Sequence, residues 1–278
     1  MEKSIEHREI TKIVDGQNSY LENDILAVEE PLQIVLTASQ QNPPIIKKNI
    51  SVTMRTPGDD DALSVGFLFT EGIIQSSSKI KSISSKENQT TIEVEQSATI
   101  DISKLQRNFY TTSSCGVCGK SSLEAVRTIC EPELPTQEFS VTRAVVLSLS
   151  SKMRRQQNVF QNTGGLHAVG LFDRQGTLIM IKEDVGRHNA LDKVIGSVLL
   201  EETASDLGFP LSQHILLLSG RASFELIQKS VMAGIKVVVA IGSPSSMAVA
   251  LAEDHNITLI GFLKKANFNI YTGAHRIT

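Results

Sequence analysis

Buried strands and helices alternate through the second half of this 278-residue chain, and this alternation restricts its fold more than any other feature. Apolar runs at 214–218, 236–241 and 257–262 are separated by segments of helical spacing at 187–200, 222–233 and 246–253. Strands that are apolar throughout belong to sheets covered on both faces, and the helices between them supply the cover. The pattern therefore predicts an α/β fold with a parallel or mixed sheet.

The first hundred residues predict a smaller region of strands and one helix. Residues 1 to about 20 are polar, and we expect a partly mobile leader there. A strand from Ile25 to Leu36 contains Pro31, which indicates an edge strand, and a second strand ends after Met54. Three acids then open a helix that stops at Gly72. A metal cluster is one interpretation of Asp59–Asp61, but carboxylates that compensate a helix dipole are favoured.

The middle of the chain predicts two hairpins and a long helix. Apolar and polar residues alternate weakly over 76–100, as in a hairpin with one solvent-exposed face. Apolar residues over 142–162 have helical spacing throughout. A hairpin with strands at 166–172 and 178–182 follows. We therefore divide the chain into an N-terminal strand and helix region at 1–110, a cysteine segment at 111–130 and an α/β core at 131–278, regions that could also form one compact domain.

Cys115 and Cys118 form a Cys-x-x-Cys pair surrounded by glycine and serine. Ser121 and Glu124 predict a capping box that opens a helix directly after the pair. A helix N-terminus and a nearby lysine both favour thiolate over thiol. A zinc half-site, a dithiol redox site and a sulfur-carrying nucleophile all remain open, while Cys130 fits a small buried hydrophobe.

The loops that follow the predicted strands share glycine, serine and cationic residues. Ligands of open α/β sheets bind beyond the carboxyl ends of the strands. Glycine lets the backbone approach a ligand, helix N-termini offer free N–H groups, and cations add charged donors. The sequence thus predicts an anion site, most plausibly for phosphate or pyrophosphate, with cations at Arg187, Arg221, Lys264 and Lys265. His167 and His188 could be acids, ligands or structural residues.

Composition excludes several classes of function. A formal net charge of -3 gives no global reason to bind nucleic acid or membrane, and no apolar run is long enough to span a bilayer. Three cysteines do not form a disulfide framework, which favours a reducing compartment. The first thirty residues lack the apolar core of a signal peptide, so we expect a cytoplasmic protein.

Seven separated motifs in order resemble the FdhD family. They are Met54–Asp60, Gly66–Gly72, Ser114–Gly119, Thr163–Ala168, Glu183–Lys193, Ser219–Glu225 and Tyr271–Thr272. The resemblance implies a homodimer with a cytidine-deaminase-like three-layer α/β fold that lacks the deaminase zinc site and holds no metal of its own. It also implies a sulfurtransferase that accepts sulfur as a persulfide from a cysteine desulfurase. The sulfur passes to the bis-molybdopterin guanine dinucleotide cofactor of molybdenum or tungsten, as formate dehydrogenase requires.

The resemblance also assigns residues. Cys115 matches the persulfide position and Cys118 an assisting thiol, and GDP is a surrogate ligand. The residues expected to contact the cofactor are Arg187, His188, Asn189, Ser219, Gly220, Arg221, Gly242, Ser243, Phe262, Leu263, Lys264, Lys265, Ala266 and Asn267. Ser243–Ser246 and Lys264 depart mildly from the family pattern. A non-catalytic cofactor chaperone and a dithiol-disulfide oxidoreductase are the alternatives.

Overall fold

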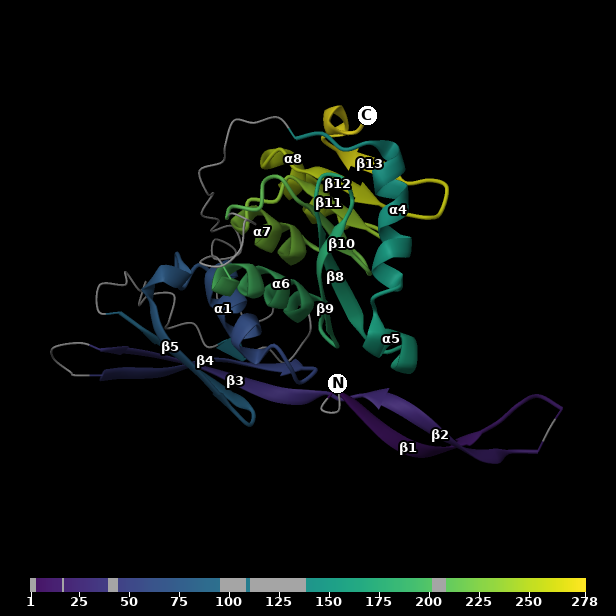
Figure 1. Cartoon of the computed structure of the whole chain (residues 1–278), viewed down its shortest axis with the longest axis horizontal. Coiled ribbons are helices and arrows are strands. Elements are labelled where there is room, and N and C mark those ends of the chain that lie inside the picture. Colours follow the sequence, from purple (N-terminus) through teal and green to yellow (C-terminus); the bar gives the residue numbers. More distant parts are fainter. Residues whose placement is uncertain (1–3, 17, 40–44, 96–108, 111–138, 202–208) are drawn as a thin grey trace.

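A computed structural model describes residues 4–16, 18–39, 45–95, 109–110, 139–201 and 209–278. Its largest element is a six-stranded mixed sheet in the order β13-β12-β11-β10-β8-β9 (Figure 1). The strands are β8 (His167–Phe172), β9 (Leu178–Asp184), β10 (Ile215–Leu218), β11 (Val237–Ala240), β12 (Thr258–Gly261) and β13 (Asn269–Thr272). β10, β11 and β12 are parallel, and β8 and β13 run against their neighbours. The predicted α/β class with a mixed sheet is confirmed.

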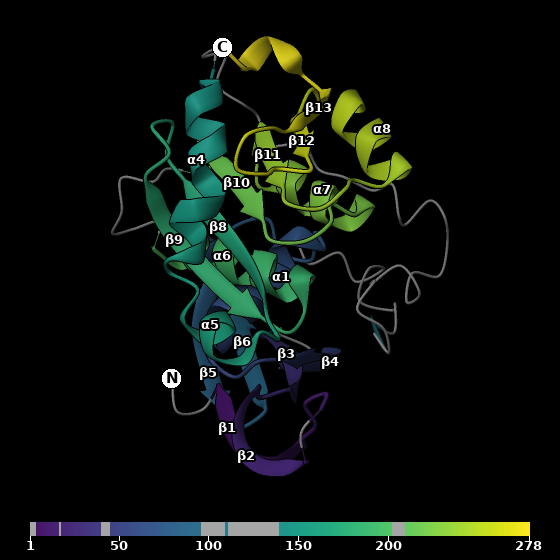
Figure 2. The same cartoon turned by 90° about the vertical axis from the view of Figure 1, so that its right-hand side faces the viewer.

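Helices cover both faces of this sheet, as the apolar strands predict. One face packs against α6 (Arg187–Glu201), α7 (Phe224–Met232) and α8 (Ser246–Asp254), and the other packs against α4 (Arg143–Arg154) (Figure 2). Alternate residues of each strand enter the two cores: Leu216 and Leu218 face α6 and α7, whereas Ile215 and Leu217 face α4. Every residue of β10, β11 and β12 is therefore buried.

A second sheet of five strands lies below α6 in Figure 1. Its order is β5-β6-β3-β4-β7, with β3 (Glu30–Ser39), β4 (Ile45–Arg55), β5 (Ile80–Lys86), β6 (Gln89–Val94) and β7 (Phe109–Tyr110). The predicted hairpin is confirmed as β5 and β6, after the short 3-10 helix Ser77–Lys79. α1 (Asp60–Thr70) joins this sheet to α6, and one apolar cluster contains residues of both sheets.

The N-terminal segment contains one hairpin that was not predicted, and one prediction for it is wrong. The polar leader contains a hairpin, β1 (Ile5–Lys12) and β2 (Tyr20–Ala27), which projects from the body (Figure 1). Its pattern is weak because neither strand buries a full face, but Asp15–Gly16 is a turn signal and Gly16 has a positive φ of 74°. β3 is an inner strand, not an edge strand. Pro31 is tolerated there because pairing with β6 begins only at Gln33.

The long helix predicted over 142–162 is two helices, α4 and α5 (Asn158–Thr163). The Glu183 carboxylate accepts hydrogen bonds from the backbone N–H of Val159, at 3.1 Å, and of Phe160, at 2.9 Å. A carboxylate from a neighbouring strand thus supplies the partner that free N–H groups at a new helix start require. The sequence pattern also missed β13 and the final 3-10 helix, Ala274–Arg276.

The contact between α1 and α6 depends on two glycines. A Cβ atom at Gly66 would lie 1.9 Å from the carbonyl oxygen of Asp192, and one at Gly196 would lie 1.8 Å from the carbonyl oxygen of Ala62. No side chain fits at these distances, so the two backbones touch directly. This close approach holds the N-terminal sheet against the larger sheet.

Gly66→Ala should therefore lower the free energy of unfolding by roughly 1–3 kcal/mol, because the two helices must separate. Helix propensity alone predicts the opposite sign, since alanine favours a helix over glycine by about 1 kcal/mol. Urea denaturation of Gly66→Ala and of a control, Gly165→Ala, measures the difference. The nearest atom to a Cβ at Gly165 is 3.8 Å away, so the control should be close to neutral. Equal stability of the two variants would contradict the close-contact account.

Candidate anion-binding site

Four strands of the large sheet point in one direction and end at a common edge. β9 shares the direction of β10, β11 and β12 because β8 is antiparallel to both of its neighbours. We call the loops 185–188, 219–223, 241–245 and 262–267, together with His167 at the start of β8, the carboxyl edge. This is where ligands of open α/β sheets bind.

Backbone hydrogen bonds join the carboxyl-edge loops to one another. Gly242 donates its N–H to the carbonyl of Gly220 at 2.9 Å, and Phe262 donates to the carbonyl of Gly242 at 3.0 Å. A Cβ at Gly242 would meet Arg221 and the Gly220 carbonyl at 3.0 Å. Ser219 accepts a hydrogen bond on Oγ from the Ala168 backbone at 2.8 Å. The loops therefore form one continuous surface, and Ser219 belongs to its scaffold.

Three helices begin at this edge. α6 starts at Arg187, α7 at Phe224 after the N-cap Ser223, and α8 at Ser246 after the N-cap Ser245. Ser245 accepts a hydrogen bond from the Ala248 N–H at 3.2 Å and so caps α8. Ser223 makes no such cap bond, and its Oγ lies 3.3 Å from Nε2 of His188. Converging N-termini place positive dipole ends and free N–H groups on one surface, which suits an anion.

Arg187 provides a cation at the start of α6, after the outermost strand β9. Its Nε is buried and has no hydrogen-bond partner among the residues that the structure describes. A guanidinium group carries five N–H donors and is not deprotonated in proteins, so a buried N–H without an acceptor is costly. The buried Nε–H of Arg187 is therefore suited to donate to an anionic ligand. Arg221 is exposed on the neighbouring loop.

His188 forms an ion-pair contact next to Arg187. Its Nε2 lies 3.0 Å from Oε2 of Glu225 on α7, and both side chains are largely buried. The contact fixes the orientation of the imidazole toward α7. No role was predicted for Glu225, although an acid in the first turn of the helix that follows the Ser219–Arg221 loop is a signal that the sequence shows.

His167 lies between the loops of β9 and β10. It is opposite Asp184 in the sheet, and a Cβ at Gly220 would be 3.4 Å from its Nδ1. Burial lowers its pKa below the usual 6.5, electrostatic interaction with Arg187 and His188 lowers it further, and Asp184 opposes this shift. His167 is therefore expected to be neutral at pH 7.

The loop after β12 combines exposed residues and buried residues. Phe262 has a positive φ of 52° and is 40% exposed, a strained conformation that turns its ring outward. Leu263 is buried in the core next to α4 and packs rather than contacts a ligand. Lys264 donates its backbone N–H to the Asn267 carbonyl at 2.9 Å, which closes a turn. Lys265, Ala266 and Asn267 are exposed, as is the Lys264 side chain.

Asn189 is directed away from the edge, into the N-terminal sheet. Its Nδ2 donates to the Met54 carbonyl at 2.7 Å and to Asp184 at 3.1 Å, and its Oδ1 accepts from the Thr53 hydroxyl at 3.2 Å. All of these partners are protein groups. Asn189 thus links the carboxyl edge to the end of β4, a contact 136 positions apart in sequence that no local pattern could reveal.

The same part of β4 pairs with the strand that leads into the cysteine segment. β7 is parallel to β4, with Phe109 opposite Ser51 and Tyr110 opposite Val52. The chain therefore leaves Tyr110 in the direction of Thr53 and Met54, which are bonded to Asn189. Cys115, Cys118 and Cys130 lie outside the described residues, as does the predicted capping box.

The fold is that of an α/β protein with a candidate anion site at one edge of its sheet, and comparison with known proteins gives its family. The sequence model of the FdhD/NarQ family matches residues 27–278, and the chain belongs to this family. Proteins named "Sulfur carrier protein FdhD" are similar over nearly their full length. The Streptomyces coelicolor protein is 43% identical, with 100% of this chain and 97% of the relative covered. The Mycolicibacterium paratuberculosis protein is 44% identical, with 97% of each covered.

A solved structure has the same fold. The crystal structure of a "putative formate dehydrogenase accessory protein" from Desulfotalea psychrophila aligns with a TM-score of 0.76 at 24% identity. The alignment covers 99% of this chain and 100% of that one. Among the described residues, no helix is long and apolar enough to cross a membrane.

The His167 environment makes a prediction about pH. Because its folded pKa is lowered, His167 contributes stability above pH 6.5 that is lost as pH falls through the folded pKa. NMR titration of the imidazole should give a midpoint below 6.5, and Arg187→Gln should raise that midpoint by removing a nearby positive charge. Arg221→Gln is the matched control and should leave it unchanged. A midpoint at or above 6.5 in the unmodified protein would show that His167 is exposed or ion-paired.

Proposed function

We propose that this chain is a sulfur carrier that serves formate dehydrogenase. It accepts sulfur from a cysteine desulfurase as a persulfide on Cys115, with Cys118 assisting, and delivers that sulfur to the bis-molybdopterin guanine dinucleotide cofactor. The cofactor is cargo bound at the carboxyl edge, and GDP is its surrogate. The names of the similar proteins support the sulfur-carrier role and the formate dehydrogenase connection. We place this work in the cytoplasm, in a homodimer with a cytidine-deaminase-like fold.

The observation that carries the proposal is the position of Tyr110, the last described residue before the cysteine segment. β7 holds Tyr110 beside Val52, and the next residues of β4 are hydrogen-bonded to Asn189, two positions after Arg187. Cys115 stands five residues after Tyr110, and an extended chain spans about 3.3–3.6 Å per residue. Five residues of extended chain span at most roughly 17 Å from Tyr110, and the proposal requires that the ligand held by Arg187 lies within this reach.

The chemistry of sulfur acceptance needs only the thiols and the donor. The Cys115 thiolate attacks the outer sulfur of the donor persulfide, a new S–S bond forms on Cys115, and the donor cysteine leaves as thiolate. No external oxidant or reductant enters this exchange. A thiolate is required, since the thiol is a poor nucleophile.

The carboxyl edge suits the anionic part of the cargo. Arg187 has a buried N–H without an acceptor among the described residues, Gly220 and Gly242 let the loops pack closely against His167 and Arg221, and three helix N-termini face the same surface. Phosphate groups match the first and the last of these features. Arg187, Arg221 and Lys264 would hold the pyrophosphates, and Phe262 offers a ring against which a guanine base can stack.

Mass spectrometry after incubation with a cysteine desulfurase and cysteine tests the proposal. The unmodified protein should gain one sulfur atom on Cys115, and Cys115→Ser should lose this gain together with activation of formate dehydrogenase. Cys130→Ser is the control and should still load sulfur. Full loading and activation by Cys115→Ser would refute the assignment. Bound zinc without persulfide would instead indicate a cofactor chaperone, and turnover of a small disulfide would indicate an oxidoreductase.

A further inference from the structure

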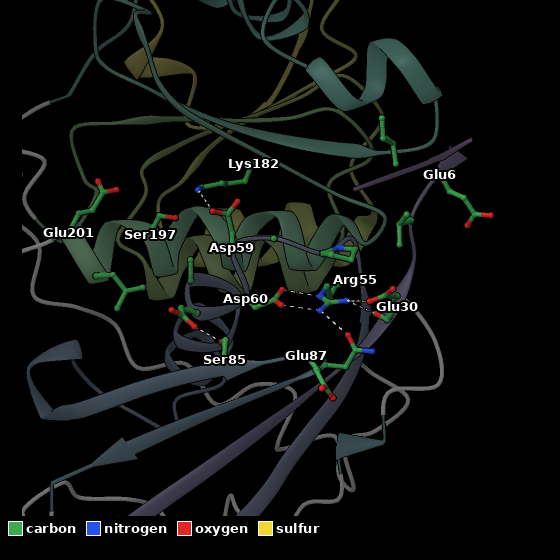
Figure 3. A pocket seen from close by; sticks show the side chains of 18 residues that line it. Glu6, Glu30, Arg55, Asp59, Asp60, Ser85, Glu87, Lys182, Ser197 and Glu201 are labelled. Carbon is green, nitrogen blue, oxygen red and sulfur yellow. Dashed lines mark hydrogen bonds and ion pairs between the residues drawn. The ribbon is translucent and has the colours of Figure 1, made fainter. Parts of the chain in front are cut away.

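A large pocket lies beside the C-terminal end of α6, at the opposite end of this helix from Arg187. Its volume is about 1120 Å³. Figure 3 shows the side chains that line it. The 15 residues of α6 span roughly 20 Å at 1.5 Å per residue, so the pocket is separate from the carboxyl edge. Five parts of the chain line it: the base of the β1–β2 hairpin, the loop before α1, the β5–β6 turn, β9 and the end of α6.

Acidic side chains dominate the lining of this pocket. Its carboxylates are Glu6, Glu30, Asp59, Asp60, Asp61, Glu87 and Glu201, and its cations are Arg55 and Lys182. The C-terminal end of a helix adds a negative partial charge. A concave surface lined by one sign of charge concentrates the field and attracts the opposite charge.

Both cations of the pocket are already neutralised. Arg55 is almost fully buried and donates from Nε and Nη2 to the two carboxylate oxygens of Asp60, each at 2.9 Å. Lys182 contacts Asp59 at 2.9 Å. Asp61 accepts a hydrogen bond from the Ser85 hydroxyl. The acids at the start of α1 thus hold neighbouring elements in place, and none of them makes the side-chain cap bond that a helix start would suggest.

The remaining acids leave uncompensated negative charge at the rim. Glu87 and Glu201 are exposed and have no hydrogen bond or ion pair among the described residues. Glu6 is also exposed and only approaches Arg8, at 3.6 Å. A partner with positive charge would therefore find free carboxylates here.

A buried hydroxyl faces the same pocket. Ser197 is only 6% exposed, yet it lines the pocket and points toward the ion pair of Lys182 and Asp59 (Figure 3). Its hydroxyl has no hydrogen-bond partner among the described residues. The hydroxyl is therefore open to a hydrogen-bond donor that enters the pocket.

We propose that this acidic pocket binds a basic segment of a partner protein. One lysine or arginine side chain of the segment enters the pocket and donates to Ser197, while its neighbours meet Glu87 and Glu201 at the rim. The volume exceeds the roughly 300–1,000 Å³ of typical small-molecule pockets, and the charge is spread over several elements. Both features fit an extended segment better than a single small cation. The proposal is independent of the sulfur-carrier function.

Fluorescence anisotropy with the full chain and a labelled, acetylated Lys-Arg-Lys-Arg-Lys-Arg peptide tests this site. Ser197→Ala should weaken binding roughly fivefold, since one lost hydrogen bond corresponds to that factor. Glu87→Gln combined with Glu201→Gln should weaken it by a similar factor and reduce its salt dependence. Glu253→Gln combined with Asp254→Asn removes the same charge from exposed positions at the end of α8 and should leave the affinity unchanged.

Several outcomes would overturn the proposal. They are no peptide binding at low salt, equal binding of a Glu-only peptide, full affinity of Ser197→Ala, or an equal loss in the α8 control. Tighter binding of spermine than of the peptide would indicate that the pocket binds a polyamine and not a segment of a partner protein. Circular dichroism confirms folding of each variant, and persulfide loading of Cys115 should be unchanged in Ser197→Ala, which separates this test from that of the proposed function.

Discussion

The buried ion pair of Asp184 and Lys193 is the interaction on which the arrangement of the molecule depends. Lys193 Nζ lies 2.7 Å from Oδ2 of Asp184, and both side chains are almost completely buried. Lys193 also donates to the Thr56 carbonyl at 2.9 Å, and Asp184 accepts from the N–H groups of Thr56 and Gly186. One pair thus joins the end of β9, the middle of α6 and the end of β4.

Burial raises the pKa of Asp184, and the charge and hydrogen bond of Lys193, the Gly186 N–H and Asn189 oppose that shift. Removing one partner of such a pair leaves a buried charge and costs about 3–5 kcal/mol. The same pair determines where Arg187 stands, because α6 begins three residues after Asp184. A second buried pair, Lys229 with Asp192 at 2.9 Å, fixes the middle of α6 to α7 and, through Thr70, to α1. Structural ion pairs therefore position the cation of the candidate site.

Much of the fold could be predicted from the sequence, because local patterns report local structure. The apolar runs around Leu216, Val238 and Leu259 are strands of a covered sheet, and the helices between them lie where their spacing predicts. The failures share a physical cause: partners distant in sequence. Glu183 splits the helix predicted over 142–162 by bonding to Val159 and Phe160, and pairing of β3 with both β4 and β6 makes an inner strand of a segment with a proline.

The candidate site also has a part that local sequence patterns predict and a part that depends on partners distant in sequence. The strand-end loops predict an anion site, and the hydrogen bonds between Gly220, Gly242 and Phe262 bring those loops together. The direction of Asn189 was not predictable, since Thr53 and Met54 carry no signal of a partner on α6. The acidic pocket could not be predicted from the sequence either, because its five parts are adjacent only in the folded chain.

The central claim is that the persulfide of Cys115 and the anion site of Arg187 act on one ligand. Cyanide releases the outer sulfur of a persulfide as thiocyanate, so its rate reports how accessible that sulfur is. In persulfide-loaded protein, the bis-molybdopterin guanine dinucleotide cofactor should slow thiocyanate release, and Arg187→Ala should abolish this protection at the same cofactor concentration. Release at the same rate with and without cofactor, at a concentration where the cofactor is bound, would contradict the claim that the two sites meet.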